Sequence, residues 1–305
     1  MGVGLAVLWT LLLALAGSAL VAAIEPHRLG HGNEPGPAAE LRTLPWRRSR
    51  RPDRWLHGAA PVVALIALAW AVLILPFGRE LIGADLGIGL FYFLVVVDIL
   101  LLAVALGGWG ADTADAVECC YRVIAQLVAY VVPLGLAVIG PAMMARSLST
   151  VDIVEAQARA GLWYVVAQPL GFALFVAAGL MQSYRAPFLE PFAQRLQQAM
   201  LASYAPPLRA LWRVALSGLL FVVAAMGATL FLGGYAGPWL PGWAWMLLKT
   251  LAMIVLMLGL GRCFALRSSA QMLALSWKLL IPLGLLNVLV VGALILLGVG
   301  QGAFR

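Results

Sequence analysis

Long apolar runs alternate with short polar connections along almost the whole chain. Runs long enough for a helix to cross a bilayer, about 20 residues, lie at 2–24, 56–77, 85–107, 117–145, 160–181, 208–232, 239–261 and 277–299. Backbone groups in lipid must pair within their own segment, which favours helices, and the sequence shows none of the ten-residue alternation that is typical of membrane barrels. The pattern predicts an all-α integral membrane protein, a single membrane domain over 1–305 with eight transmembrane helices.

Composition agrees with this prediction. Hydrophobic residues make up 63% of the chain and charged residues 11%, whereas a soluble domain carries roughly a quarter charged residues. Residues 1–24 lack a basic leading region, and their apolar run is longer than that of a signal peptide, so we expect a retained first helix. The small residues Ala16, Gly17 and Ser18 keep a cleaved signal peptide as the alternative.

The basic residues predict how the helices are oriented. The first, fifth and seventh connections carry most of them: Arg28, Arg42, Arg47, Arg48, Arg50, Arg51, Arg54, Arg185, Arg195, Arg262 and Arg267. Basic loops stay in the cytoplasm, which places both termini on the periplasmic side and makes 25–55 and 182–207 cytoplasmic loops. The Arg-rich loop 25–55 is either a topology anchor or a contact surface for acidic lipids or a partner subunit.

No motif of a soluble enzyme is visible. Cys119, Cys120 and Cys263 lack metal-site spacing, and the three histidines fall in or beside the first loop. The chain contains no P-loop and no dinucleotide fingerprint, and a basic excess in a membrane protein indicates topology rather than nucleic-acid binding. We therefore expect no metal site, no covalently bound cofactor and no nucleic-acid partner, so that any redox cofactor belongs to another subunit.

Ionisable residues inside spans are costly, and each one is a functional-site hypothesis. Asp98 lies in the middle of the span 85–107 with no basic residue near it in sequence; a protonated carboxyl bonded to a neighbouring helix is the alternative. Glu118, Arg122, Gln126 and Tyr130 recur every four residues and therefore share one helix face. This polar stripe predicts a proton path through Asp98, Glu118, Arg122 and Gln126. A simple ion pair within the helix is the alternative for Glu118 and Arg122.

Several segments together resemble one known family, the H subunit of bacterial NADH-quinone oxidoreductase, the counterpart of mitochondrial complex I subunit 1. The similarity covers nearly the whole chain, is most specific from about residue 108 onward and is weakest over 25–55; membrane subunits of energy-converting hydrogenases are a more distant match. The segments that carry it are Gly108-Trp109-Gly110, Arg122 to Gln126, Val132-Pro133-Leu134-Gly135-Leu136, Asp152-Ile153-Val154, Gln168-Pro169-Leu170-Gly171-Phe172, Arg185-Ala186-Pro187-Phe188, Thr229 to Gly234, and Trp277-Lys278 with Pro282-Leu283 and Leu286-Asn287.

The resemblance implies a membrane subunit of a proton-translocating NADH-quinone oxidoreductase in a bacterial inner membrane, in contact with lipid and with other membrane and peripheral subunits. Such a subunit docks the redox arm, forms part of the chamber for the quinone substrate and begins a line of buried acids; it holds no catalytic centre by itself. The loop 182–207 corresponds to the chamber-lining loop. The chamber residues that the resemblance implies are Arg28, Tyr184, Arg185, Pro187 and Phe188.

The chain departs from the family where the family has carboxylates. The acidic positions are occupied by neutral residues that cannot exchange a proton near neutral pH: Val131, Gln182, Leu189, Phe192 and Gln194. Asp98 and Glu118 then supply a substitute proton route, or the chain has none. The alternative function is a paralogous membrane anchor of a complex-I-like or hydrogenase-like assembly that has lost proton coupling or quinone binding. A free-standing transporter is disfavoured because the sequence shows no repeated halves.

Overall fold

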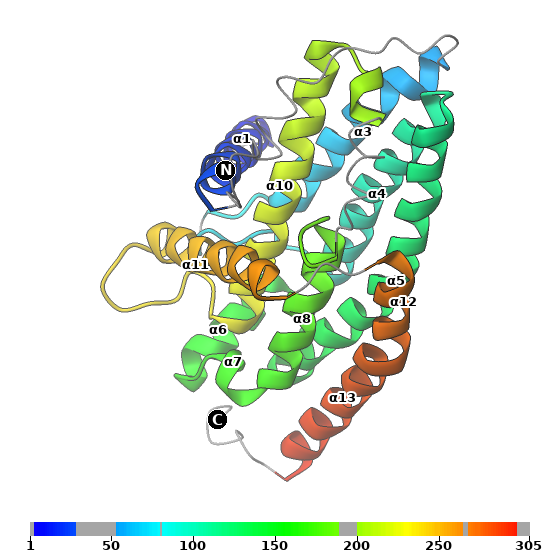
Figure 1. The fold of residues 1–305 in the computed structure, drawn as a ribbon. Coiled ribbons are helices and arrows are strands. Elements are labelled where there is room, and N and C mark those ends of the chain that lie inside the picture. The colour runs from blue at the N-terminus through cyan, green and yellow to red at the C-terminus, as the bar shows by residue number, and fades with distance from the viewer. Residues whose placement is uncertain (1–2, 29–52, 80, 189–199, 265–267, 298–305) are drawn as a thin grey trace.

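The computed structural model describes residues 3–28, 53–79, 81–188, 200–264 and 268–297, and within these ranges the chain forms helices and no strand. The predicted all-α fold is therefore confirmed for the described residues, and Figure 1 shows the helices gathered in one bundle. Most of the Arg-rich loop, together with Leu189, Phe192 and Gln194, lies outside the described residues.

The helices follow one another with short connections. They are α1 (Val3–Arg28), α3 (Arg54–Leu73), α4 (Gly89–Gly110), α5 (Ala114–Ala145), α6 (Thr150–Ala160), α7 (Tyr164–Ala167), α8 (Pro169–Gln182), α10 (Pro206–Phe231), α11 (Gly242–Cys263), α12 (Ser269–Leu275), the π-helical turn η1 (Ser276–Leu280) and α13 (Ile281–Leu296).

Six of the eight predicted spans have a described helix long and apolar enough to cross a membrane. These are α3, α4, α5, α10, α11 and the continuous segment from α12 to α13. The other two correspond to shorter apolar helices, Leu12–Ile24 within α1 and Pro169–Gln182 in α8. A multi-pass membrane protein is thus supported, while the count of eight and the periplasmic termini stay predictions.

The predicted span 160–181 is interrupted. Gly161 ends α6 in the left-handed region, with φ of 61°, and Gln168 separates the single turn of α7 from α8 with φ of −140°. Pro169 is the first residue of α8; it has no N–H to donate and it disfavours a helical residue before it. At 1.5 Å per residue the 14 residues of α8 extend about 21 Å, less than the ~30 Å of a hydrocarbon core.

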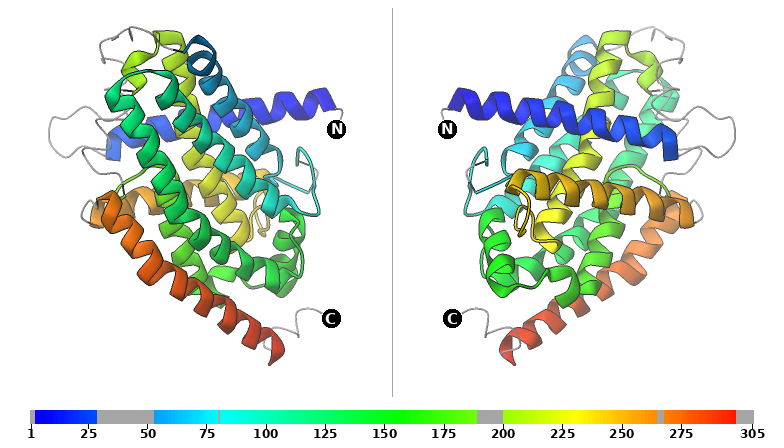
Figure 2. Two further views of the ribbon diagram at one scale, coloured as in Figure 1. Left: turned by 90° about the vertical axis from the view of Figure 1, so that its right-hand side faces the viewer. Right: turned by 90° about the vertical axis from the view of Figure 1, so that its left-hand side faces the viewer.

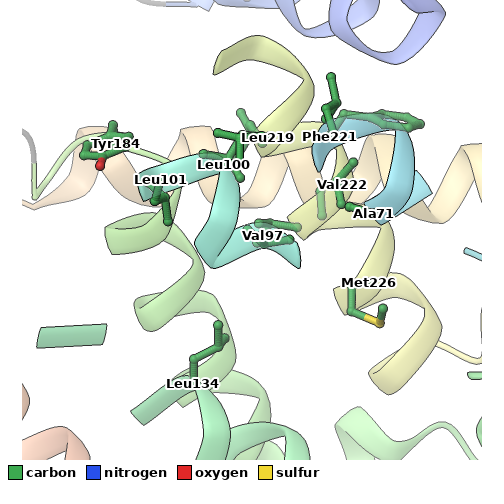
Figure 3. Close-up of a cluster of buried hydrophobic side chains, with 14 of the residues drawn as sticks. Ala71, Val97, Leu100, Leu101, Leu134, Tyr184, Leu219, Phe221, Val222 and Met226 are labelled. Atoms are coloured by element: carbon green, nitrogen blue, oxygen red, sulfur yellow. The ribbon is translucent and has the colours of Figure 1, made fainter. Parts of the chain in front are cut away.

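Helix α10 is the central helix of the bundle. Within its most apolar 18 residues, 94% are buried inside the protein. Glycines allow its neighbours to approach closely: a Cβ on Gly17 of α1 would lie 2.5 Å from the Phe221 ring, and one on Gly179 of α8 would lie 2.8 Å from Val223. Figure 2 shows α1 and α11 running across the direction of α10. In Figure 3 the apolar side chains of α3, α4 and α10 meet in one cluster, represented by Ala71, Val97, Leu100, Phe221 and Val222.

The π-helical turn η1 compensates for a proline in α5. Pro133 has no N–H, so the carbonyl of Ala129, four residues earlier, loses its helical donor. The hydroxyl of Ser276, the first residue of η1, donates a hydrogen bond to this carbonyl, and both residues are buried. The π-helical turn and the proline therefore belong to one contact between α5 and the last helical segment.

Candidate functional site

The residues implied as chamber residues form a compact turn where α8 ends. Tyr184 occupies the left-handed region with φ of 53°. Its N–H donates to the Met181 carbonyl at 3.4 Å, and the Arg185 N–H donates to the Leu180 carbonyl at 3.3 Å. These two bonds make a Schellman motif, in which a glycine usually takes the left-handed position. A tyrosine there indicates that contacts of its side chain hold the backbone in place.

A second tight turn follows at once. The Phe188 N–H donates to the Arg185 carbonyl at 3.1 Å, across a cis Ala186–Pro187 peptide bond. This is the geometry of a type VI turn. The turn rests on α11, because a Cβ added to Gly261 would lie 2.5 Å from the Ala186 carbonyl oxygen. Helices α8 and α11 therefore fix the segment Tyr184–Phe188, which we call the Tyr184 turn.

The Tyr184 turn carries buried polar groups without partners. Gln182 is 0% exposed and Tyr184 4% exposed, and neither the Gln182 amide nor the Tyr184 hydroxyl has a hydrogen bond from any described residue. Burial, with the thiols of Cys119 and Cys120 nearby, raises the pKa of the Tyr184 phenol well above its ordinary value. Tyr184 is therefore a neutral O–H donor at any physiological pH. Unpaired groups of this kind are uncommon in folded proteins and favour a site that binds something.

The polar stripe on α5 leads from the protein surface toward this turn. Glu118 and Arg122 form the expected ion pair at 3.0 Å, and Arg122 also donates to the Ser269 hydroxyl of α12 at 3.3 Å. One helical turn deeper, the Gln126 amide donates to the Met181 carbonyl of α8. Since an exposed ion pair contributes little to stability, the buried Gln126 bond is the stronger link between α5 and α8.

Asp98 meets the same stripe from α4. Its Oδ1 accepts a hydrogen bond of 2.9 Å from the Tyr130 hydroxyl, and the Gln182 side chain also faces Tyr130. Asp98, Tyr130, Gln182 and Tyr184 thus follow one another from the middle of α4 to the Tyr184 turn. Val131, beside Tyr130 on α5, packs against the apolar core.

The structure does not bring every candidate together. Arg28 is the last residue of α1, and its side chain lies outside what the structure describes. Pro187 and Phe188 belong to the Tyr184 turn, whereas Glu118 lies on the outer surface of α5 with its side chain 46% exposed. No group of three His, Cys, Asp or Glu side chains within the described ranges could hold a metal ion.

Two polar contacts could not be predicted from the sequence. Lys249, inside α11, donates to the Ala236 carbonyl at 2.7 Å, with its ammonium 5.1 Å from the Trp163 ring and 5.4 Å from the Trp245 ring. Gln157 of α6 is buried; its amide nitrogen donates to the carbonyls of Thr229 and Leu230 at 3.0 and 3.2 Å, and its oxygen accepts from the N–H of residue 164. The only sequence signals are an ionisable residue in a span and a glutamine in a short amphipathic helix.

Comparison with known proteins identifies the family. The sequence model described as NADH dehydrogenase matches residues 47–292. The first of two H subunits of the NADH-quinone oxidoreductase of Geobacter metallireducens is 34% identical over 285 residues, which cover 89% of this chain and 86% of that protein. The H subunit of Geobacillus kaustophilus is 32% identical over 241 residues, 77% of this chain and 72% of that protein. The resemblance that the motifs indicated is confirmed, and the chain belongs to the NADH dehydrogenase family that includes the H subunits of the NADH-quinone oxidoreductases.

Proposed function

We propose that this chain is the membrane subunit of an NADH-quinone oxidoreductase in a bacterial inner membrane, and that it lines the quinone chamber with the Tyr184 turn and docks the redox arm. Family membership makes it a subunit of an enzyme complex whose other subunits are its partners. The observation that carries the chamber assignment is the pair of buried, unpaired polar side chains at this turn, Gln182 and Tyr184.

The chemistry of the turn suits a quinone headgroup. A quinone has two carbonyl oxygens that accept hydrogen bonds and a flat apolar ring. Tyr184 offers a neutral O–H donor, the Gln182 amide donates or accepts, and Phe188 supplies a mostly buried aromatic surface. Ligand sites in proteins combine an apolar wall with a few convergent polar groups in this way. Arg28, Arg185 and Pro187 complete the proposed set on this chain.

The proposed proton path differs from the arrangement that the family resemblance implies. Val131 and Gln182 cannot carry a proton, and the titratable group that faces Tyr130 is Asp98. We therefore assign the coupling role to Asp98, with Glu118, Arg122 and Gln126 as the stripe toward the surface. The alternative function, an anchor subunit that has lost proton coupling, is favoured by the apolar surroundings of Val131.

Kinetics of the purified complex test the chamber assignment. Tyr184→Phe removes one hydrogen bond to the quinone and should raise the KM for a short-chain quinone roughly 2- to 12-fold. Arg185→Ala should lower quinone reductase activity, while electron transfer from NADH to ferricyanide, which needs only the redox arm, stays unchanged. Arg79→Ala is the matched control, since Arg79 pairs with Glu155 at 3.2 Å away from this turn. Wild-type quinone kinetics in both turn variants would reject the assignment.

Proton translocation separates the two functions. Asp98→Asn keeps the size of the side chain and removes its titratable group. If Asp98 couples quinone reduction to pumping, the number of protons moved per electron falls in reconstituted vesicles while quinone reduction continues. A wild-type ratio in Asp98→Asn would make Asp98 structural. An absence of pumping in the wild-type complex would favour the anchor subunit.

A further inference from the structure

One face of α4 has no partner within the described protein. Its large side chains are 43% to 59% exposed and recur at helical spacing along the whole helix: Phe91, Val95, Leu102, Leu106 and Trp109. Asp98 fills the one remaining place in this series, three residues after Val95 and four before Leu102. The stripe is therefore an apolar seam with a carboxylate at its centre, and we call it the Asp98 seam.

Asp98 lies at the depth where a carboxylate is least favourable. It is nine residues after Gly89 in a helix of 22 residues, hence about 14 Å along a length of about 33 Å. Tyr130 satisfies one carboxylate oxygen at 2.9 Å. No other described residue bonds to Asp98, and its side chain is only half-buried. Aspartate at the centre of a membrane helix costs about 2.5–3.5 kcal/mol even on insertion scales.

The described basic residues of the spans do not compensate for this carboxylate. Arg122 is paired with Glu118 at 3.0 Å, and the Lys249 ammonium is bound to the Ala236 carbonyl at 2.7 Å between two indole rings. The second oxygen of Asp98 must then find its donor outside the part of the chain that the structure describes. Lipid tails offer no donor.

We propose that the Asp98 seam is the contact surface for a transmembrane helix of another subunit of the same assembly, and that this helix presents an N–H or O–H donor to Asp98. A lone polar residue in an apolar seam selects register and partner in this manner, and polar side chains bond across helices in membranes. A second copy of the chain is a poor occupant, because two-fold symmetry would place two carboxylates opposite each other. The proposal does not depend on the quinone chamber.

Crosslinking in the intact complex identifies the occupant. A photoreactive benzoylphenylalanine at position 102, one turn from Asp98, should yield an adduct with one membrane-embedded subunit. We expect the adduct on a helix that has a donor side chain within a turn of the same depth. The same residue at Leu15 of α1, which is also exposed, is the control and should not capture that helix. Adducts with lipid alone, or with a second copy of this chain, would overturn the proposal.

Substitution of Asp98 tests the role of the carboxylate in this contact. Asp98→Asn keeps an acceptor oxygen and should retain the partner subunit. Asp98→Leu leaves the donor of the partner unpaired and should lower the amount of partner that co-purifies roughly 3- to 30-fold. The amount of Asp98→Leu chain in the membrane is measured alongside, and the crosslink from position 102 is made in the unsubstituted Asp98 background. Equal retention of the partner in the Asn and Leu variants would show that Asp98 does not specify the contact.

Discussion

The contact between Ser276 and Ala129 makes a quantitative prediction about how α5 tolerates its proline. Ser276→Ala removes the donor that replaces the N–H missing at Pro133. The Ala129 carbonyl is then buried without a partner, since Ala129 is 0% exposed. An unpaired buried carbonyl costs about 1–3 kcal/mol in soluble proteins, and hydrogen bonds between membrane helices average about 0.6 kcal/mol with a maximum near 1.7. We expect Ser276→Ala to lower the free energy of unfolding by about 1 kcal/mol.

A double-mutant cycle isolates this effect. Pro133→Ala restores an N–H four residues after Ala129, so the carbonyl can again accept a bond within its own helix. In that background Ser276→Ala should have almost no effect, which gives a coupling energy of about 1 kcal/mol. Ser18→Ala serves as the control because the Ser18 hydroxyl donates to the Leu15 carbonyl of its own helix at 2.8 Å. Its loss leaves no proline-freed carbonyl unpaired.

Equilibrium unfolding of the full-length chain in mixed micelles, titrated with SDS and followed by tryptophan fluorescence, measures each free energy. Four proteins are compared: the wild type, Ser276→Ala, Pro133→Ala and the double variant. The reasoning fails if Ser276→Ala costs as much with alanine at position 133 as with proline. It also fails if Ser276→Ala costs no more than Ser18→Ala.

Two further substitutions test the packing around the site. Gly261→Ala places a Cβ 2.5 Å from the Ala186 carbonyl and should displace the Tyr184 turn, so the KM for quinone rises; Gly259→Ala, which meets nothing within 4 Å, should leave the KM unchanged, and equal kinetics of the two variants would contradict the contact. Gln157→Leu keeps the side-chain volume but strands three backbone groups, and should lower the free energy of unfolding by about 2–4 kcal/mol in the same SDS titration. Arg159→Ala on the same helix should have little effect, and a comparable loss there would refute the explanation.

Most of the helices could be predicted because lipid imposes a length. The expected span 208–232 became Pro206–Phe231 and 85–107 became Gly89–Gly110, since an apolar run must be about 20 residues to cross. The break at Gln168 could not be predicted. Proline is tolerated inside membrane helices whenever neighbours satisfy the freed backbone groups, so the sequence alone does not separate a kink from a break.

The candidate site was predictable only along single helices. Spacing of four places Glu118, Arg122 and Gln126 on one face, and the structure has them there. The partner of Asp98 lies 32 residues away on another helix, and no local pattern indicates such a pairing. Tyr184 in the left-handed region was also beyond reach, because that conformation is uncommon for bulky residues and depends on tertiary contacts.

The burial of α10 has a consequence for biogenesis. Three of the helices that enclose it, α1, α3 and α8, precede it in the chain, and α11 follows. During synthesis the membrane therefore holds an unfilled groove, bordered by Gly17 and Gly179, before the helix that fills it has been made. A chain truncated before Pro206 would leave that groove open to lipid. A separately expressed segment starting at α10 would be its natural complement, so the order of helices along the chain is also an order of assembly.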